Sequence, residues 1–282
     1  MMLKWEEKST VKCIYGLFRG AVCGSRTVAF FNPLGVPSIY CFDYCSKQWS
    51  ELPRFPIPSS DFALVVINDL LTTVGGTKSN KLFSFSEGKW VEEFPPMPTR
   101  RHYLAAVCTG HSLVVAGGRN QDKQALPTVE VMDTNTLQWF TAAGLPRGID
   151  WASMTTCREN LYLFGDDTTH VYSCSLQALL QTCKASTSQQ ASVWNRVTDL
   201  PVKRSTAATL CGQLVSVGGR DDKRVEVNSV YCYDPETTTW KIIGQIPSCE
   251  SYPLVTTLTE DKLIMVHGLE NVTIDIASAK MS

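Results

Sequence analysis

Charge of one sign and long apolar runs are both scarce in this sequence. The 282 residues carry 26 Lys and Arg against 27 Asp and Glu, so the formal net charge is −1. Nucleic-acid binding needs clustered Lys and Arg, so no nucleic-acid partner is expected. The N-terminal MMLKWEEKSTVKC lacks the apolar core of a signal peptide, and no apolar run approaches the length of a membrane span. A membrane partner is therefore not expected either.

Motifs for catalysis and for cofactors are missing as well. The sequence has no serine nucleophile motif, no Walker loop and no dinucleotide fingerprint. A metal centre needs convergent His, Cys or carboxylate ligands. The four histidines are assigned to different units, and His111 to a turn on the opposite face from His102, His170 and His267. The one compact acid–histidine group, Asp166-Asp167 beside His170, is interpreted as a polar turn. We expect no cofactor, no metal and no catalytic residue.

Cysteine is present in an odd number, eleven, and most cysteines fall in predicted strands. Strand cysteines behave as small hydrophobic residues. The sequence has no second cysteine pair, at the spacing of metal ligands, that could complete a metal site with Cys41 and Cys45. Reduced thiols are the simplest interpretation, and they predict a cytoplasmic protein.

What the sequence does contain is a repeat. The stretch from Ser205 to Trp240 predicts four short β-strands, because β-branched and aromatic runs alternate there with Gly, Pro and Asp. One such unit cannot bury its own faces, so stacked copies are expected. An inner strand, a turn and a second strand recur in residues 21–33, 63–76, 104–118, 153–166 and 254–268.

A third strand and a tryptophan complete most units. The tryptophans of the predicted outer strands are Trp5, Trp49, Trp90, Trp139, Trp194 and Trp240. Their intervals of 44, 41, 49, 55 and 46 residues match the periods of WD40 and Kelch arrays. In three units an aspartate stands six residues before the tryptophan, namely Asp43, Asp133 and Asp234.

The details of the unit resemble the Kelch repeat. The second strand ends in a double glycine at Gly75-Gly76, Gly117-Gly118 and Gly218-Gly219, and a proline-containing link follows each tryptophan of the internal units. A WD40 chain would show Trp-Asp dipeptides, and here no tryptophan is followed by aspartate. In Kelch proteins these glycines, tryptophans and prolines form the scaffold, so we assign them no functional role.

The resemblance implies an all-β fold, a six-bladed Kelch-type β-propeller with four-stranded antiparallel blades. One domain over residues 1–282 is expected, because 282 divided by six gives 47 residues a blade. The predicted blades span about 11–52, 62–93, 103–141, 151–197, 205–243 and 252–276. The last blade lacks a fourth strand of its own, and we expect residues 2–8 to supply it. Leu3–Glu7 would pair with Val272–Ile276, close the ring and cover an exposed edge. The alternative is a fourth strand that begins at Met281 in a longer chain.

The predicted fourth blade carries the only large insertion, over residues 176–191. Its first half holds helix-forming residues and its second half is rich in Ser and Gln. A mobile excursion with one helical turn is expected, open to proteases over residues 177–191.

By resemblance to Kelch propellers, the partner binds on the face that carries the between-blade links and the loops after the second strands. Arginines and aromatic residues around a concavity are typical of a binding hot spot. The predicted partner-binding residues are Arg100, Arg101, His102, Arg119, Trp151, Arg204, Arg220 and Tyr252. Arginine forks onto carboxylates, so four arginines with few matching acids (Arg101, Arg119, Arg204 and Arg220) would attract an acidic peptide.

The expected function is that of a non-catalytic, monomeric protein-interaction module, a substrate-recognition or scaffolding subunit. Kelch propellers often serve cullin-linked ubiquitin ligases, for which a BTB domain would have to come from another segment or chain. Actin binding is a second family role that the sequence neither supports nor excludes. The alternative class is a small-molecule enzyme of the sugar-isomerase type, similar to the sialic-acid mutarotases.

Overall fold

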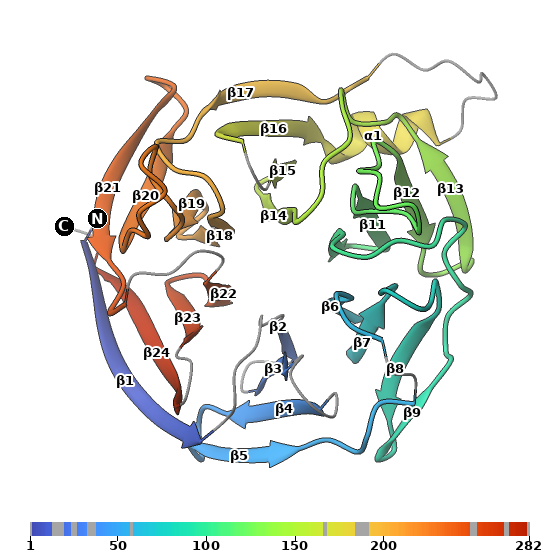
Figure 1. Cartoon of the computed structure of the whole chain (residues 1–282), viewed down its shortest axis with the longest axis horizontal. Coiled ribbons are helices and arrows are strands. Elements are labelled where there is room, and N and C mark those ends of the chain that lie inside the picture. The colour runs from blue at the N-terminus through green and yellow to red at the C-terminus, as the bar shows by residue number, and fades with distance from the viewer. Residues whose placement is uncertain are drawn as a thin grey trace.

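The computed structural model describes residues 2–12, 20–23, 27–32, 38–56, 59–165, 168–183, 192–248, 253–267 and 271–280. Within them the strands form six four-stranded sheets arranged radially around a central channel (Figure 1). All strand pairs are antiparallel. The predicted all-β propeller with four-stranded antiparallel blades is confirmed.

The strands occupy equivalent places in each blade. The innermost are β2 (Gly20–Cys23), β6 (Ala63–Ile67), β10 (Ala105–Thr109), β14 (Ser153–Cys157), β18 (Thr206–Leu210) and β22 (Leu254–Thr259). The second are β3 (Thr27–Asn32), β7 (Leu70–Val74), β11 (Ser112–Ala116), β15 (Asn160–Phe164), β19 (Gln213–Val217) and β23 (Lys262–His267). The third are β4 (Ser38–Asp43), β8 (Leu82–Ser86), β12 (Val129–Asp133), β16 (His170–Ser175), β20 (Ser229–Asp234) and β24 (Asn271–Lys280). The outermost are β5 (Gln48–Glu51), β9 (Lys89–Val91), β13 (Gln138–Ala142), β17 (Asn195–Asp199), β21 (Thr239–Gln245) and β1 (Met2–Lys12).

The N-terminal strand β1 is the outer strand of the last blade, as the sequence predicts. Its predicted register and length are wrong. Leu3 lies opposite Ala279 and Glu7 opposite Asp275, because β24 continues through residues 277–280 and β1 runs on to Lys12. Val11, the expected start of the first blade, therefore belongs to the closing strand.

The hydrophobic core is divided into six clusters, each shared by two neighbouring blades. Phe42 of the first blade, for example, packs with Ile264 and Ile276 of the last. Leu3 and Trp5 of β1 pack beside the cluster between the fifth and last blades. Each blade is thus stabilised by its neighbours, and the closing strand contributes to one of these contacts.

The aspartate–tryptophan spacing has a structural cause. The Asp133 carboxylate accepts the backbone N–H groups of Asn135 (2.8 Å) and Thr136 (3.0 Å), and Leu137 then takes a left-handed φ of 58°. The same turn follows the aspartates of the first and fifth blades. Trp139 enters the outer strand directly after it and donates its indole N–H to the Pro95 carbonyl of the neighbouring link (3.1 Å). The repeat therefore encodes a hairpin and a contact between blades.

The insertion begins with helix α1 (Leu176–Thr182), so the predicted helical turn is confirmed. A mobile excursion was expected here, but this helix packs against the propeller. Leu179 is fully buried in the cluster between the third and fourth blades, and the Thr182 hydroxyl accepts the Ala143 N–H (2.9 Å). Residues 184–191 lie outside the described residues. In the described part of the chain, no helix is long and apolar enough to cross a membrane.

Candidate partner-binding mouth of the central channel

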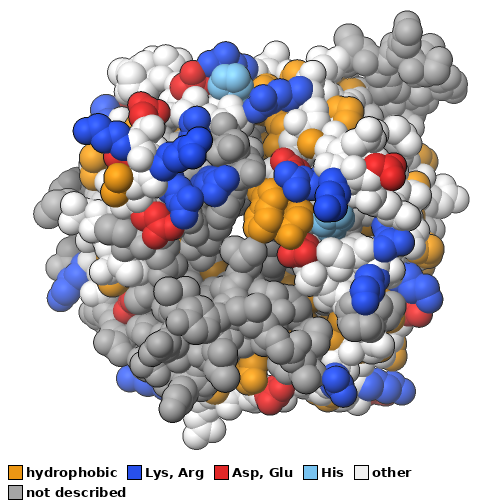
Figure 2. All heavy atoms as spheres, viewed as in Figure 1, with side chains coloured by type: hydrophobic (Ala, Val, Ile, Leu, Met, Phe, Trp, Pro, Cys, Tyr) orange, Lys and Arg blue, Asp and Glu red, His pale blue; other side chains and the backbone are white. Residues whose placement is uncertain are grey.

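The innermost strands of all six blades line a central cavity of about 550 Å³. Small aliphatic residues such as Ala63, Val65 and Ala105 line it on the second and third blades, and threonines line it on the fourth to the last. Among the described lining residues, Asp61 is the only charged one. On the face in view in Figure 2 the molecule is hollowed near its centre, with apolar side chains on one border and Lys or Arg side chains on the other.

The threonine hydroxyls of the channel bridge neighbouring blades. Thr209 donates its hydroxyl to the Thr156 carbonyl, and Thr257 donates to the Thr209 carbonyl, both at 2.6 Å. Hydroxyls engaged in this way have structural partners already. The channel wall thus has a structural role, and the candidate partner-binding residues lie at its mouth.

A non-glycine residue with positive φ stands two positions before four of the innermost strands. These residues, which we call the mouth ring, are Asp61 (φ 61°), Tyr103 (54°), Trp151 (49°) and Arg204 (58°). A left-handed conformation is uncommon for bulky side chains, and such strain concentrates at functional sites. Tyr252 holds the equivalent sequence position before β22 but lies outside the described residues.

The double glycines hold the links beside the mouth. Gly118 has a φ of 90°, and a Cβ there would lie 2.7 Å from the His102 carbonyl oxygen. A Cβ at Gly219 (φ 112°) would lie 2.5 Å from the carbonyl of Lys203. Only glycine lets the second strand end so close to the link, so the family's glycine signature positions the mouth ring.

Two members of the mouth ring form an aromatic wall. The rings of Tyr103 and Trp151 stack with centroids 3.8 Å apart and planes 17° apart, although they come from different links. His102 lies against Tyr103 with a centroid distance of 4.9 Å. A rigid, half-exposed aromatic surface beside a cavity is a typical anchor for a partner.

Charges of both signs surround the aromatic wall. Arg119 forms an ion pair with Asp150, and Arg100 donates to the Thr77 carbonyl. Burial lowers the pKa of His102, which the carboxylate of Asp61 opposes and the guanidinium of Arg119 reinforces. The His102 imidazole is therefore neutral at pH 7 and offers one donor and one acceptor at the mouth.

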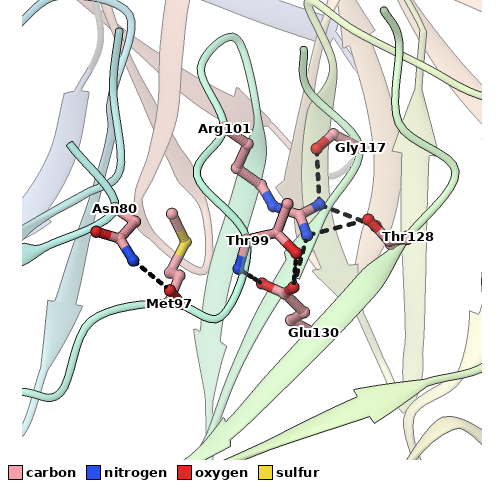
Figure 3. A network of polar contacts seen from close by, with 7 residues as sticks. All are labelled: Asn80, Met97, Thr99, Arg101, Gly117, Thr128 and Glu130. Atoms are coloured by element: carbon pink, nitrogen blue, oxygen red, sulfur yellow. Dashed lines mark hydrogen bonds and ion pairs between the residues drawn. The ribbon is translucent and has the colours of Figure 1, made fainter. Parts of the chain in front are cut away.

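Arg101 was expected at this mouth, and the structure places it inside the protein (Figure 3). It is fully buried and forms an ion pair with Glu130 (3.0 Å). Its guanidinium also donates to the carbonyls of Gly117 (2.9 Å) and Thr128 (3.0 Å). The prediction that Arg101 meets a partner is wrong, because its position in the link faces the space between blades, as the buried Ile149 and Val202 do in the next two links.

The other predicted arginines were expected to have few matching acids, but two of them are paired with carboxylates. Arg220 pairs with Glu226 (2.9 Å), and Arg119 pairs with Asp150 as described. A second concavity of about 390 Å³, which we call the basic pocket, is lined by Lys203, Arg204, Arg220, Asp221, Asp222 and Arg224. The predicted set therefore divides: Arg100, His102, Arg119 and Trp151 lie around the aromatic wall, and Arg204 and Arg220 line the basic pocket.

Sequence reasoning missed Tyr103 and Asp61 as mouth residues and Lys203 as a pocket residue. The usable signal was position, because each residue of the mouth ring stands two places before an innermost strand. Within the described residues, no group of three or more His, Cys, Asp or Glu side chains is placed to hold a metal ion.

Comparison with known proteins identifies the repeat. The model of the KLHDC2/KLHL20/DRC7 Kelch-repeats domain matches residues 82–268. The chain belongs to the Kelch-repeat family.

Curated relatives of this Kelch chain are long proteins. Kelch-like protein 36 of Bos taurus is 26% identical over 260 residues, which cover 85% of this chain and 39% of the relative. Kelch-like protein 41b of Danio rerio is 27% identical over 135 residues, or 45% of this chain and 22% of the relative. The chain thus spans about two fifths of these relatives' length or less.

Among solved structures, that of YjhT superposes with a TM-score of 0.74 and covers 93% of this Kelch chain and 94% of its own. The sequence identity is 15%, so the likeness concerns the fold alone. Kelch-like relatives suggest a protein-interaction propeller, and the enzyme alternative stays open beside it.

Proposed function

We propose that this propeller is a protein-interaction module whose channel mouth binds an extended acidic segment of a partner. The mouth ring carries the proposal, because left-handed backbone places Trp151, stacked on Tyr103, at the central cavity and places Arg204 at the basic pocket. The Kelch-like relatives support protein partners in general. The role within a larger assembly would be substrate recognition or scaffolding.

Charge favours an acidic partner segment. The basic pocket holds four cationic side chains and two carboxylates, and it lies at the links and loops of the fifth blade. On the side of the aromatic wall, Arg119 and Asp150 neutralise each other. A segment with an apolar side chain on Tyr103 and Trp151 and an acidic side chain toward the fifth blade complements both parts.

The sugar-isomerase alternative has no comparable support at residue level. The likeness to YjhT shows a shared fold, and a fold hosts many functions. The interaction role is therefore the function that we propose.

The test is affinity purification with quantitative mass spectrometry, comparing the parent protein with a Tyr103→Ala/Trp151→Ala variant. Both rings are half-exposed, so the variant should fold, which a thermal melt checks. Loss of two central aromatic anchors should reduce capture of specific partners by about tenfold or more. Ile242→Ala is the matched control, since Ile242 is a 62% exposed hydrophobic residue on the outer strand β21. Equal capture by the double variant and the control would refute binding at the mouth.

A further inference from the structure

The loops after the second strands of the third and fifth blades share one backbone design. In the third blade, His102 and Arg119 exchange backbone hydrogen bonds of 3.1 and 2.7 Å. In the fifth blade, Lys203 and Arg220 do the same at 2.8 and 2.7 Å. Asn120 and Asp221 then accept two amides each within their own loops. Because the frames are the same, the side chains alone distinguish the two sites.

The substitutions between the two frames add charges of both signs to the fifth blade. Lys203 stands where the third blade has His102, and Arg204 stands where it has Tyr103. Arg224 takes the left-handed place of Lys123, with φ values of 64° and 62°. Arg224 keeps the charge of Lys123, while Asp221, Asp222 and Glu226 stand where the third blade has Asn120, Gln121 and Ala125. The fifth-blade site therefore gains both cations and carboxylates on a common frame.

Two of the four cations of the basic pocket have no side-chain partner in the described part of the chain. Within the described residues, Lys203 and Arg224 make no side-chain hydrogen bond or ion pair. The Nε of Arg220 is buried without a hydrogen-bond partner, although its terminal nitrogen pairs with Glu226. Asp221 uses one carboxylate oxygen to accept the amides of its own loop. The basic pocket thus presents four cations and two carboxylates around about 390 Å³.

We propose that the basic pocket recognises a phosphorylated side chain, a phosphoserine or phosphothreonine, within the partner segment. A phosphate monoester carries a charge of about −1.5 to −2 at pH 7 and three acceptor oxygens, which several separate donors can satisfy together. A single carboxylate offers two oxygens and one charge, and one arginine fork saturates it. The four lining cations exceed the two lining carboxylates by two, and the pairing of Arg220 with Glu226 reduces this excess to one. Separate donors on a lysine and on arginines of the link and the loop match the three phosphate oxygens better than they match one carboxylate.

This inference rests on the proposed interaction role and specifies the anion that the mouth selects. It also gives Lys203 and Arg224 a specific ligand, where the proposed function uses them only as part of the charge of the basic pocket. The aromatic wall and the basic pocket would then contact different parts of one segment.

The first experiment titrates methyl-labelled protein with three capped tripeptides, Gly-phosphoserine-Gly, Gly-Glu-Gly and Gly-Ser-Gly, using the methyl signals of Val225 as reporter. Val225 is 57% exposed in the same loop. We expect the phosphoserine peptide to bind at least about tenfold more tightly than the glutamate peptide, and the serine peptide not to bind. A Lys203→Ala/Arg224→Ala variant should lose about tenfold or more. Lys223→Ala is the control, because Lys223 is an exposed cation of the loop that does not line the pocket. Equal affinity for phosphoserine and glutamate, or equal affinity of the variant and the parent, would overturn the proposal.

A second experiment separates this proposal from the interaction role. Lysate is treated with phosphatase before affinity capture, and partners that depend on Lys203 and Arg224 should disappear. If partners that depend on Tyr103 and Trp151 are still captured after phosphatase treatment, that result would contradict the phosphate proposal and would agree with the interaction role. If the aromatic variant captures every partner as the parent does, the interaction role fails, and the peptide titration still decides the phosphate site.

Discussion

Replacing Arg101 by methionine should lower the free energy of unfolding by roughly 3–5 kcal/mol, because it leaves the buried Glu130 carboxylate without its cation. The Arg101 guanidinium makes four contacts in this network, with the Gly117 carbonyl, the Thr128 carbonyl and hydroxyl, and the Glu130 carboxylate (Figure 3). They tie the second link to the third blade. For a chain of this length, the loss corresponds to a fall in the melting temperature on the order of 5–10 °C. Chemical denaturation with a linear extrapolation measures it.

A double variant makes this result specific. Arg101→Met/Glu130→Leu removes both charges, and an apolar pair of similar size is often tolerated where a lone charge is not. We expect it to be more stable than Arg101→Met alone. If the Arg101→Met variant has the melting temperature of the parent, the Arg101 guanidinium does not stabilise the fold through its contact with Glu130.

Deleting residues 1–12 should destabilise the propeller by about 2–4 kcal/mol and promote self-association. The deletion removes Leu3 and Trp5, which are partly buried against the core between the fifth and last blades. Full burial of one large apolar side chain contributes about 1.5–3 kcal/mol, so each of these two contributes less than that. It also exposes the edge of β24, and a bare edge strand recruits other chains. Thermal melts and analytical ultracentrifugation measure the two effects.

Complementation provides the control for the deletion. A synthetic peptide of residues 2–12, added in excess, should pair with β24 and restore the monomer. A truncated protein that melts like the parent and stays monomeric would show that β1 does not close the ring in solution.

Repetition explains which parts of this structure could be predicted. Strand order and ring closure follow from the spacing of tryptophans and glycine pairs, since every blade repeats one hairpin design. The register of β1 could not be predicted, because both it and β24 extend beyond the repeat consensus. The packing of α1 was missed because a Ser/Gln-rich neighbour in sequence suggested an exposed loop, whereas Leu179 is buried.

The candidate site was harder to predict than the fold. Arg101 and Arg100 are adjacent in the sequence, and only the blade geometry turns one inward and leaves the other near the mouth. The acids that pair with Arg119 and Arg220 lie 31 and 6 residues away, so their pairing depends on loop conformation. Tyr103 was not predicted because the hypothesis considered mainly arginines. It did not consider the positive φ that the residues of the mouth ring share.

Site-specific photo-cross-linking would decide whether partners bind at the channel mouth. Benzoylphenylalanine is placed at position 103, in the mouth ring, or at position 242 on the outer strand, and the cells that produce the protein are irradiated. We expect covalent adducts with specific proteins from position 103, suppressed by excess unlabelled parent protein, and none of these from position 242. Adducts that form from position 242 and not from position 103 would contradict binding at the mouth and move the interaction surface to the outer strands.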